Sequence, residues 1–120
     1  MGTEAKRVVM RRTNCSCSMP GVWRALSFVR GALVIFHSPR PCAHIAHGMD
    51  VGSFHRLRAA GTKVRLSPVP LLTSSLSDAE AIFGGEGRLR ECIRFAAEKY
   101  QPQAIFIANS CVSGVIGDDT

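Results

Sequence analysis

Two short apolar segments with no polar interruption, residues 32–37 and 104–108, constrain the fold of this chain most. Both are rich in Val, Ile and Phe, as strands buried on both faces are. Between them, residues 86–100 carry apolar side chains at helical spacing. Strand, helix and strand alternating in this way predict an α/β fold with a parallel sheet, right-handed crossovers and flanking helices.

The other segments are assigned from spacing and breakers. They are a helix at 21–30 ended by Gly31, a short helix at 42–49, an ambiguous segment at 50–61, a strand at 63–69 and a turn at 73–78. Pro68 and Pro70 indicate that this strand ends early or lies at a sheet edge. A sheet of two or three strands with so few helices is expected to leave its faces only partly covered.

Three cysteines stand where a thiolate ligand would be expected. Cys42 and Cys111 each close a predicted strand and its following loop, and ligands gather outside the carboxyl ends of parallel strands. Cys17 lies just ahead of a predicted helix, whose N-terminal partial positive charge favours a thiolate. The three thiolates are therefore predicted to converge on one cation or cluster. Ser16, Ser18 and Ser110, with nearby backbone N–H groups, are candidate hydrogen-bond donors to the sulfur atoms.

The segments that carry these cysteines occur in a recognisable order. They are Cys17-Ser-Met-Pro-Gly-Val, His37-Ser-Pro-Arg-Pro-Cys42, Asp78-Ala-Glu-Ala-Ile-Phe-Gly-Gly-Glu-Gly-Arg-Leu89 and Pro102-Gln-Ala-Ile-Phe-Ile-Ala-Asn-Ser-Cys111-Val-Ser-Gly-Val-Ile-Gly-Asp-Asp119. With these segments the chain resembles the nitrogenase component 1 family, which includes molybdenum–iron protein subunits, their cofactor-assembly homologues and related reductases. The family usually has Gly where Ser38 and Pro41 stand.

The resemblance implies an iron–sulfur cluster, either [4Fe-4S] or P-cluster-like, bound through Cys17, Cys42 and Cys111 and shared with a second component 1 subunit. An ATP-dependent iron-protein reductase would deliver electrons, which the cluster would relay to a substrate or metallocofactor. This makes the chain a subunit of a reductase complex, inactive by itself. The alternative within the same family is a metallocofactor-assembly scaffold.

The resemblance also implies a longer subunit with several domains. Residues 15–120 would be the N-terminal part of one Rossmann-like domain, and residues 1–14 a polar leader of a kind that is often disordered. The segment 117–120 reads as the cap of a helix that does not follow. We therefore expect a fragment.

Other cysteines and histidines have plainer interpretations. Cys92 lies in the apolar stripe of its helix and is expected to be a small buried hydrophobe, whereas Cys15 remains open as a spare ligand, a reactive thiol or neither. His44 and His47 follow Cys42 closely and offer a zinc-binding module as a less favoured alternative, with Cys15 and Cys17 as further ligands. His37 and His55 are expected to be hydrogen-bonded structural histidines.

The glycine-rich segment 83–87 resembles a phosphate-binding loop but lacks its Lys-Ser/Thr ending, so a tight turn into the following helix is the preferred interpretation. The formal charge of +6 does not indicate nucleic acid, because Lys6, Arg7, Arg11 and Arg12 cluster in the leader and no nucleic-acid motif accompanies them. No apolar run approaches the ~20 residues of a membrane span. Five cysteines without a disulfide-like spacing favour a reducing cytoplasm.

Overall fold

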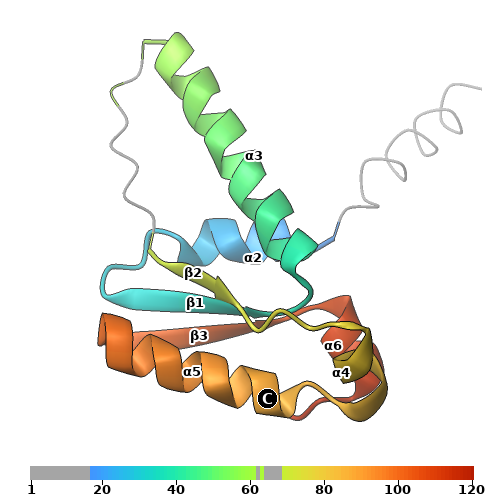
Figure 1. Cartoon of the computed structure of the whole chain (residues 1–120). Coiled ribbons are helices and arrows are strands. Elements are labelled where there is room, and N and C mark those ends of the chain that lie inside the picture. The colour runs from blue at the N-terminus through green and yellow to red at the C-terminus, as the bar shows by residue number, and fades with distance from the viewer. Residues whose placement is uncertain (1–16, 62, 64–68) are drawn as a thin grey trace, which may run out of the picture.

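The computed structural model describes residues 17–61, 63 and 69–120. Its elements are α2 (Met19–Leu26), β1 (Ala32–His37), α3 (Arg40–Ala59), β2 (Leu71–Thr73), α4 (Asp78–Phe83), α5 (Glu86–Tyr100), β3 (Ala104–Asn109) and α6 (Cys111–Ile116). The strands form one parallel sheet in the order β2-β1-β3, between α2 and α3 on one face and α5 on the other (Figure 1). The predicted α/β fold with a parallel sheet is confirmed.

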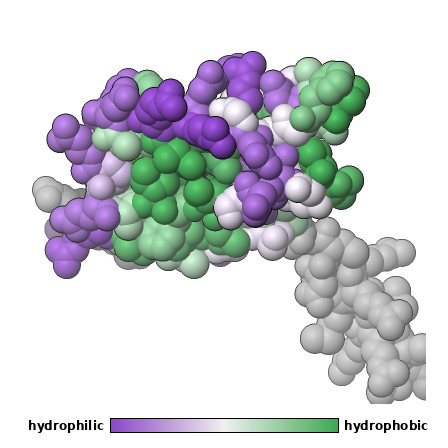
Figure 2. Space-filling model, turned by 90° about the horizontal axis from the view of Figure 1, so that it is seen from below, coloured by the Kyte–Doolittle hydropathy of each residue, from purple (hydrophilic) through white to green (hydrophobic). Residues whose placement is uncertain are grey.

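Of the two outer strands, β3 is the more apolar. Its residues other than the buried Ala108 are exposed or only partly buried, and Ile107 is 39% exposed. Figure 2 looks at the molecule from the side of β3 and α5 and shows apolar surface gathered in the middle of this face. This edge is therefore the least covered part of the sheet.

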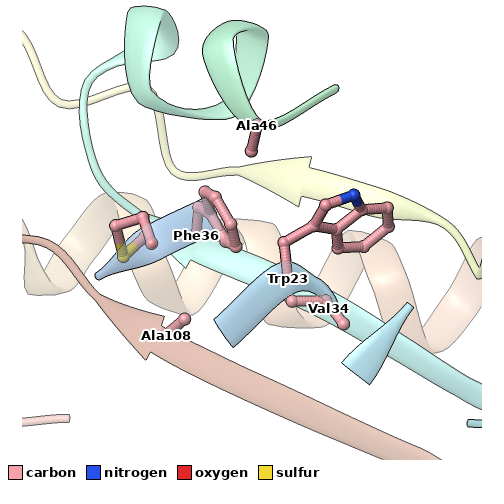
Figure 3. Packing of buried hydrophobic residues seen from close by; sticks show 6 residues of the cluster. Trp23, Val34, Phe36, Ala46 and Ala108 are labelled. Carbon is pink, nitrogen blue, oxygen red and sulfur yellow. The ribbon is translucent and has the colours of Figure 1, made fainter. Parts of the chain in front are cut away.

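The face of the sheet toward α2 and α3 holds one of two core clusters. Val34 and Phe36 of β1 pack there with Trp23 of α2 and Ala46 of α3 (Figure 3). The Trp23 and Phe36 rings meet edge to face with centroids 6.5 Å apart, a favourable aromatic arrangement. The Trp23 indole N–H also donates to the Asp50 carboxylate, which ties α2 to α3.

The opposite face of β1 holds the second cluster. Because side chains alternate along a strand, Leu33 and Ile35 point away from the first cluster and pack against Leu89 and Ala96 of α5. All six residues of β1 are buried. The expectation that the faces would be only partly covered is wrong for this central strand, because α5 and the α2–α3 pair cover it from both sides.

Several element boundaries differ from the prediction. The first helix begins earlier, at Met19, and ends at Leu26, so that Gly31 lies in the turn before β1 with φ +77°. The predicted short helix at 42–49 runs from Arg40 to Ala59 and includes the ambiguous segment. Pro39 at its N-cap and Pro41 in its first turn stand where a helix does not need the proline N–H.

The second strand lies later than predicted. Residues 64–68 of the predicted strand fall outside the described residues, and the observed β2 begins after Pro70. The carbonyl of Pro70 accepts a hydrogen bond from the Val34 amide, 3.0 Å away, so the proline lies just ahead of the strand, where its missing N–H costs nothing. Thr73 therefore ends a strand instead of opening a turn.

Two short helices, α4 and α6, were not predicted. Ser77 and Glu80 form a capping box at the start of α4, a pattern that is visible in the sequence. Ser110 caps α6, and Gly117 ends it with φ +80°, a left-handed conformation that glycine adopts easily. Gly117 therefore ends a helix, so the expectation that residues 117–120 begin one is wrong for this glycine. Within the described ranges, no helix combines the length and apolar character that crossing a bilayer requires.

Candidate metal centre

The sheet order brings two of the cysteines to one place. After β1 the chain adds β2 on one side and then returns to add β3 on the other, so the order reverses between β1 and β3. Ligands bind at such a switch point, beyond the carboxyl ends of the strands. Cys42 follows β1 in the first turn of α3, and Cys111 follows β3 as the first residue of α6.

Cys17 lies at the same end of the sheet. It precedes α2, whose start lies beside the start of α3 in Figure 1 and which also contacts β3. Cys17 and Cys111 are exposed, and Cys42 is half-buried. Burial raises the pKa of the Cys42 thiol, and the charges of Cys17 and Cys111 raise it further. Because such repulsion fades with distance, the three thiols share one neighbourhood.

The grouping is wider than a site for a single ion. Among residues 17–61, 63 and 69–120, no group of three or more His, Cys, Asp or Glu side chains could hold one metal ion. Thiolates around a tetrahedral ion with bonds of about 2.3 Å would lie within ~4 Å of one another. Convergence on one cation is thus not supported, whereas in a cluster each thiolate binds a different iron atom and a wider spacing is required.

The zinc alternative gains nothing from the structure. His44 and His47 are exposed on α3 and belong to no group that could hold a metal ion within the described part of the chain. Cys15, a further ligand of that hypothesis, lies outside the described residues. His55 is also exposed on α3, and its ring lies edge-on to that of Phe54.

Hydrogen bonds reach two of the three sulfur atoms. The Met19 amide at the start of α2 donates to Cys17 Sγ over 3.4 Å. A hydrogen bond with the Ser38 side chain lowers the pKa of Cys42, against the larger effect of burial. Donors of this kind stabilise a thiolate and tune a bound cluster. Ser38 was not predicted as a donor. The sequence did contain a signal for this role, because the family usually has glycine at this position.

Of the three serines predicted as donors, Ser110 has another role. Ser110 Oγ donates to the carbonyl of His37, 2.9 Å away, and accepts the Ser113 amide over 3.3 Å. Ser18 occupies the N-cap position of α2 without a side-chain capping bond. Ser16 lies outside the described residues. Ser110 thus fixes the start of α6 next to Cys111.

His37 is fully buried beside this site. Its Nδ1 lies 2.8 Å from Ser74 Oγ, and its Nε2 lies 2.8 Å from Asp118 Oδ2. The Asp118 side chain is itself only 3% exposed. The expectation of a hydrogen-bonded structural histidine is confirmed for His37, while the part played by Asp118 was not foreseen.

The glycine-rich turn belongs to the same network. The Gly85 amide donates to both carboxylate oxygens of Asp118, over 3.0 and 2.9 Å. A Cβ at this position would lie 2.2 Å from the Leu76 side chain and 2.8 Å from Asp118 Oδ2, so only glycine fits without a shift. A phosphate bound at this turn would use the Gly85 amide, but the Asp118 carboxylate already accepts that hydrogen bond. The interpretation of this segment as a tight turn is confirmed.

Cys92 is separate from the other thiols. It packs against the α5-side cluster that contains Leu33 and Ile35, and burial raises its pKa. Cys92 is half-buried there, which agrees with the packing role predicted for it.

Comparisons with known proteins all point to one family. A family model described as "Nitrogenase component 1 type Oxidoreductase" matches residues 17–120. The chain is 32% identical over 114 residues to a nitrogenase iron-molybdenum cofactor biosynthesis protein, NifE, of Rippkaea orientalis, with 88% of this chain and 24% of the relative covered. A NifE of Methanococcus maripaludis is 33% identical over 108 residues, with 89% of this chain and 21% of the relative covered.

Solved structures support the fold. A structure titled "Nitrogenase Cp1 at pH 6.5" superposes with a TM-score of 0.62 at 22% identity, covering 86% of this chain and 20% of that chain. The chain thus spans between a fifth and a quarter of the length of these three proteins.

Proposed function

The chain belongs to the nitrogenase component 1 type oxidoreductase family, and from this premise we propose that it supplies cysteine ligands of an iron–sulfur cluster within a metallocofactor-assembly scaffold. The observation that carries the proposal is the grouping of Cys17, Cys42 and Cys111 beyond the carboxyl end of the sheet. The scaffold role is preferred because the relatives at 31–33% identity are cofactor biosynthesis proteins.

The three thiols fit a shared cluster better than an enclosed one. Cys17 and Cys111 are exposed, so a cluster bound between them would still face outward from this chain. A second component 1 subunit would close that open side and contribute the remaining ligands. We propose a [4Fe-4S] or P-cluster-like group, since an all-thiolate donor set selects iron–sulfur clusters over hard cations.

When bound, such a cluster accepts and releases single electrons while its thiolate ligands stay in place. This chain's part is to hold those thiolates and offset their charge. Met19 N–H at Cys17 and the Ser38 side chain at Cys42 favour the charged sulfur, whereas burial of Cys42 opposes it. A cationic cluster iron would outweigh this effect of burial and favour the Cys42 thiolate, because metal ligation requires deprotonated thiols.

A second candidate function is electron relay to a substrate, with an ATP-dependent iron-protein reductase as the donor. It is favoured by the oxidoreductase family and by one surface feature. Ile82, Phe83 and Val115 are 75%, 86% and 89% exposed on α4 and α6, two helices that pack together, and α6 begins at Cys111. Exposed apolar side chains gathered near a redox site suit a transient protein partner. A reducing cytoplasm would suit either function.

The test is to isolate the tagged protein from its native cells without oxygen, so that any partner subunit is retained. Iron and acid-labile sulfide, with broad absorption near ~400 nm, are expected for a thiolate-bound cluster. Stoichiometric zinc without sulfide would overturn the cluster proposal. Transfer of bound metal to a cofactor-free nitrogenase component 1 would support the scaffold. Reductase- and ATP-dependent reduction of a substrate without such transfer would support the relay instead.

A further inference from the structure

We propose that the buried His37–Asp118 pair is a positioning device that fixes the Cys42 and Cys111 thiols relative to each other. The inference rests on the proposed cluster site and names residues that do not themselves bind the cluster. It is carried by a chain of hydrogen bonds that joins the ends of all three strands and reaches the starts of α3 and α6, the two helices that carry the cysteines.

The pair lies at the centre of five segments. His37 is the last residue of β1, Ser74 directly follows β2, and Asp118 follows α6. The third strand joins through Ser110, whose amide and hydroxyl both donate to the His37 carbonyl, over 3.2 and 2.9 Å. Gly85, at the start of α5, donates to Asp118. One side chain therefore holds together segments up to 81 positions apart.

The neutral Nε2–H tautomer of His37 satisfies this network. If Nε2 of His37 carries the proton, it donates to Asp118, and Nδ1 accepts from the Ser74 hydroxyl. Ser74 Oγ in turn accepts the Ser38 amide over 3.2 Å. Within the described part of the chain, no buried side-chain nitrogen or oxygen lacks a partner. A fully satisfied buried network of this kind is rigid and specifies one arrangement.

The network reaches the backbone of each cysteine in one or two further steps. On the Cys111 side, Ser110 is bonded to His37 and immediately precedes the cysteine. On the Cys42 side, the Ser38 amide is bonded to Ser74, and the Ser38 hydroxyl donates over 3.0 Å to the Pro39 carbonyl, which also accepts the Cys42 amide over 3.2 Å. A change at the pair is therefore expected to move the two sulfur atoms relative to each other and not merely to lower stability.

Asp118 is the residue to change. Asp118→Asn keeps the size of the side chain but replaces one acceptor oxygen with a donor group. An asparagine oxygen at the Oδ2 position still accepts from both His37 Nε2 and the Gly85 amide. The NH2 group then lies at the Oδ1 position, 3.0 Å from the Gly85 amide nitrogen, so that one hydrogen bond is lost and two donors face each other. Asp119→Asn is the matched control, since Asp119 is the exposed neighbour.

The experiment measures thiol geometry in the cluster-free full chain, apart from any measurement of iron. A short bismaleimide is added to dilute, reduced protein, and peptides joined through Cys42 and Cys111 are counted by mass spectrometry. We expect the yield of this cross-link relative to a long bismaleimide to fall by about fivefold in Asp118→Asn, as the loss of one buried hydrogen bond would cause, and to stay unchanged in Asp119→Asn. Ser74→Ala, which removes only the outer hydrogen bond, should give a smaller fall in the same direction.

Circular dichroism reports whether each variant folds. If Asp118→Asn does not fold, the cross-link ratio of Ser74→Ala is the test. An unchanged cross-link ratio in a folded variant would overturn the positioning role. In natively isolated protein, the same variants should shift the absorption or the potential of the cluster, with the iron content partly retained. A changed cross-link ratio in a protein that holds no iron even as wild type would leave the positioning role intact and reject the cluster.

Discussion

Cys42 is the residue at which opposing electrostatic effects meet. Burial and two neighbouring thiols raise its pKa, while the Ser38 side chain lowers it. In the cluster-free protein the raised pKa keeps the thiol protonated at neutral pH, and the thiolate forms only as the pH rises. Binding of the proposed cluster would therefore displace a proton from Cys42.

Ser38→Gly should make Cys42 less reactive. Loss of one hydrogen bond to the sulfur raises the pKa further, so the thiolate fraction at neutral pH falls by roughly twofold to tenfold. The measurement is the rate of iodoacetamide labelling of Cys42 in the cluster-free chain, followed by peptide mass spectrometry. Cys92 serves as an internal control because it packs on the opposite, α5 side of the sheet. An unchanged Cys42 rate would show that Ser38 does not act on the sulfur.

The cysteines should separate into ligands and a non-ligand. Cys17→Ala, Cys42→Ala and Cys111→Ala should each lose iron or alter the cluster spectrum of the natively isolated protein, because each removes a bond to iron. Cys92→Ala should keep its iron and lose on the order of 1 kcal/mol of stability. If Cys92→Ala strips the iron while Cys111→Ala does not, the ligand assignment is wrong.

At the scale of single residues, the sequence predicts those residues whose type indicates their chemistry. Cysteines after buried strands indicate ligands, and His37 at a strand end indicates a structural histidine. Asp118 could not be found in this way, because its partners lie 81 and 33 positions away and no local pattern joins them. Aspartate after a glycine is equally typical of a helix cap, which is how the segment was interpreted.

Among the elements, α4 depends most on charged groups. Hydrogen bonds from the Ser77 side chain and backbone, with Arg88 Nε 3.1 Å from Glu80 Oε1, lower the pKa of Glu80 to about 2. The carboxylate form therefore stabilises this helix start, and its contribution is lost as the pH falls through that value.

Glu80→Gln should lower the melting temperature at neutral pH. A carboxylate whose pKa is lowered stabilises the fold above its ordinary value of 4.5 and loses that effect between about pH 4.5 and about pH 2. The difference in melting temperature between wild type and variant should therefore shrink over this range. Glu91→Gln, at an exposed carboxylate 3.9 Å from Arg88, is the control and should show little difference at any pH.

Element prediction succeeded where periodicity was long or continuous. The strand at 32–37 and the helix at 86–100 match β1 and α5. The six-residue helices α4 and α6 were missed because they are too short for an apolar stripe, and only their caps mark them. The length of α3 was underestimated because its second half lacks a clear stripe, since it extends beyond the sheet in Figure 1.

For the whole molecule, the exposed edge of β3 decides how the chain behaves in isolation. The central strand is covered on both faces, so the fold has a real core. However, an apolar edge strand presents unpaired backbone groups to any other strand, and the surface around it is apolar in Figure 2. The exposed Cys17 and Cys111, beyond the carboxyl end of the sheet, would also leave a cluster open to solvent.

Expressed alone, the 120-residue chain should therefore self-associate through β3 and should not retain a stable cluster. Ile107→Lys places a charge at the 39%-exposed position on this strand and should reduce self-association, because lysine on an edge strand discourages further pairing. Val115→Lys is the control: it charges the 89%-exposed apolar position on α6, away from the strand. Light scattering during purification measures the self-association of each variant. If Val115→Lys disperses the chain and Ile107→Lys does not, the association surface is the α4–α6 side, and the edge of β3 is not what makes the isolated chain associate.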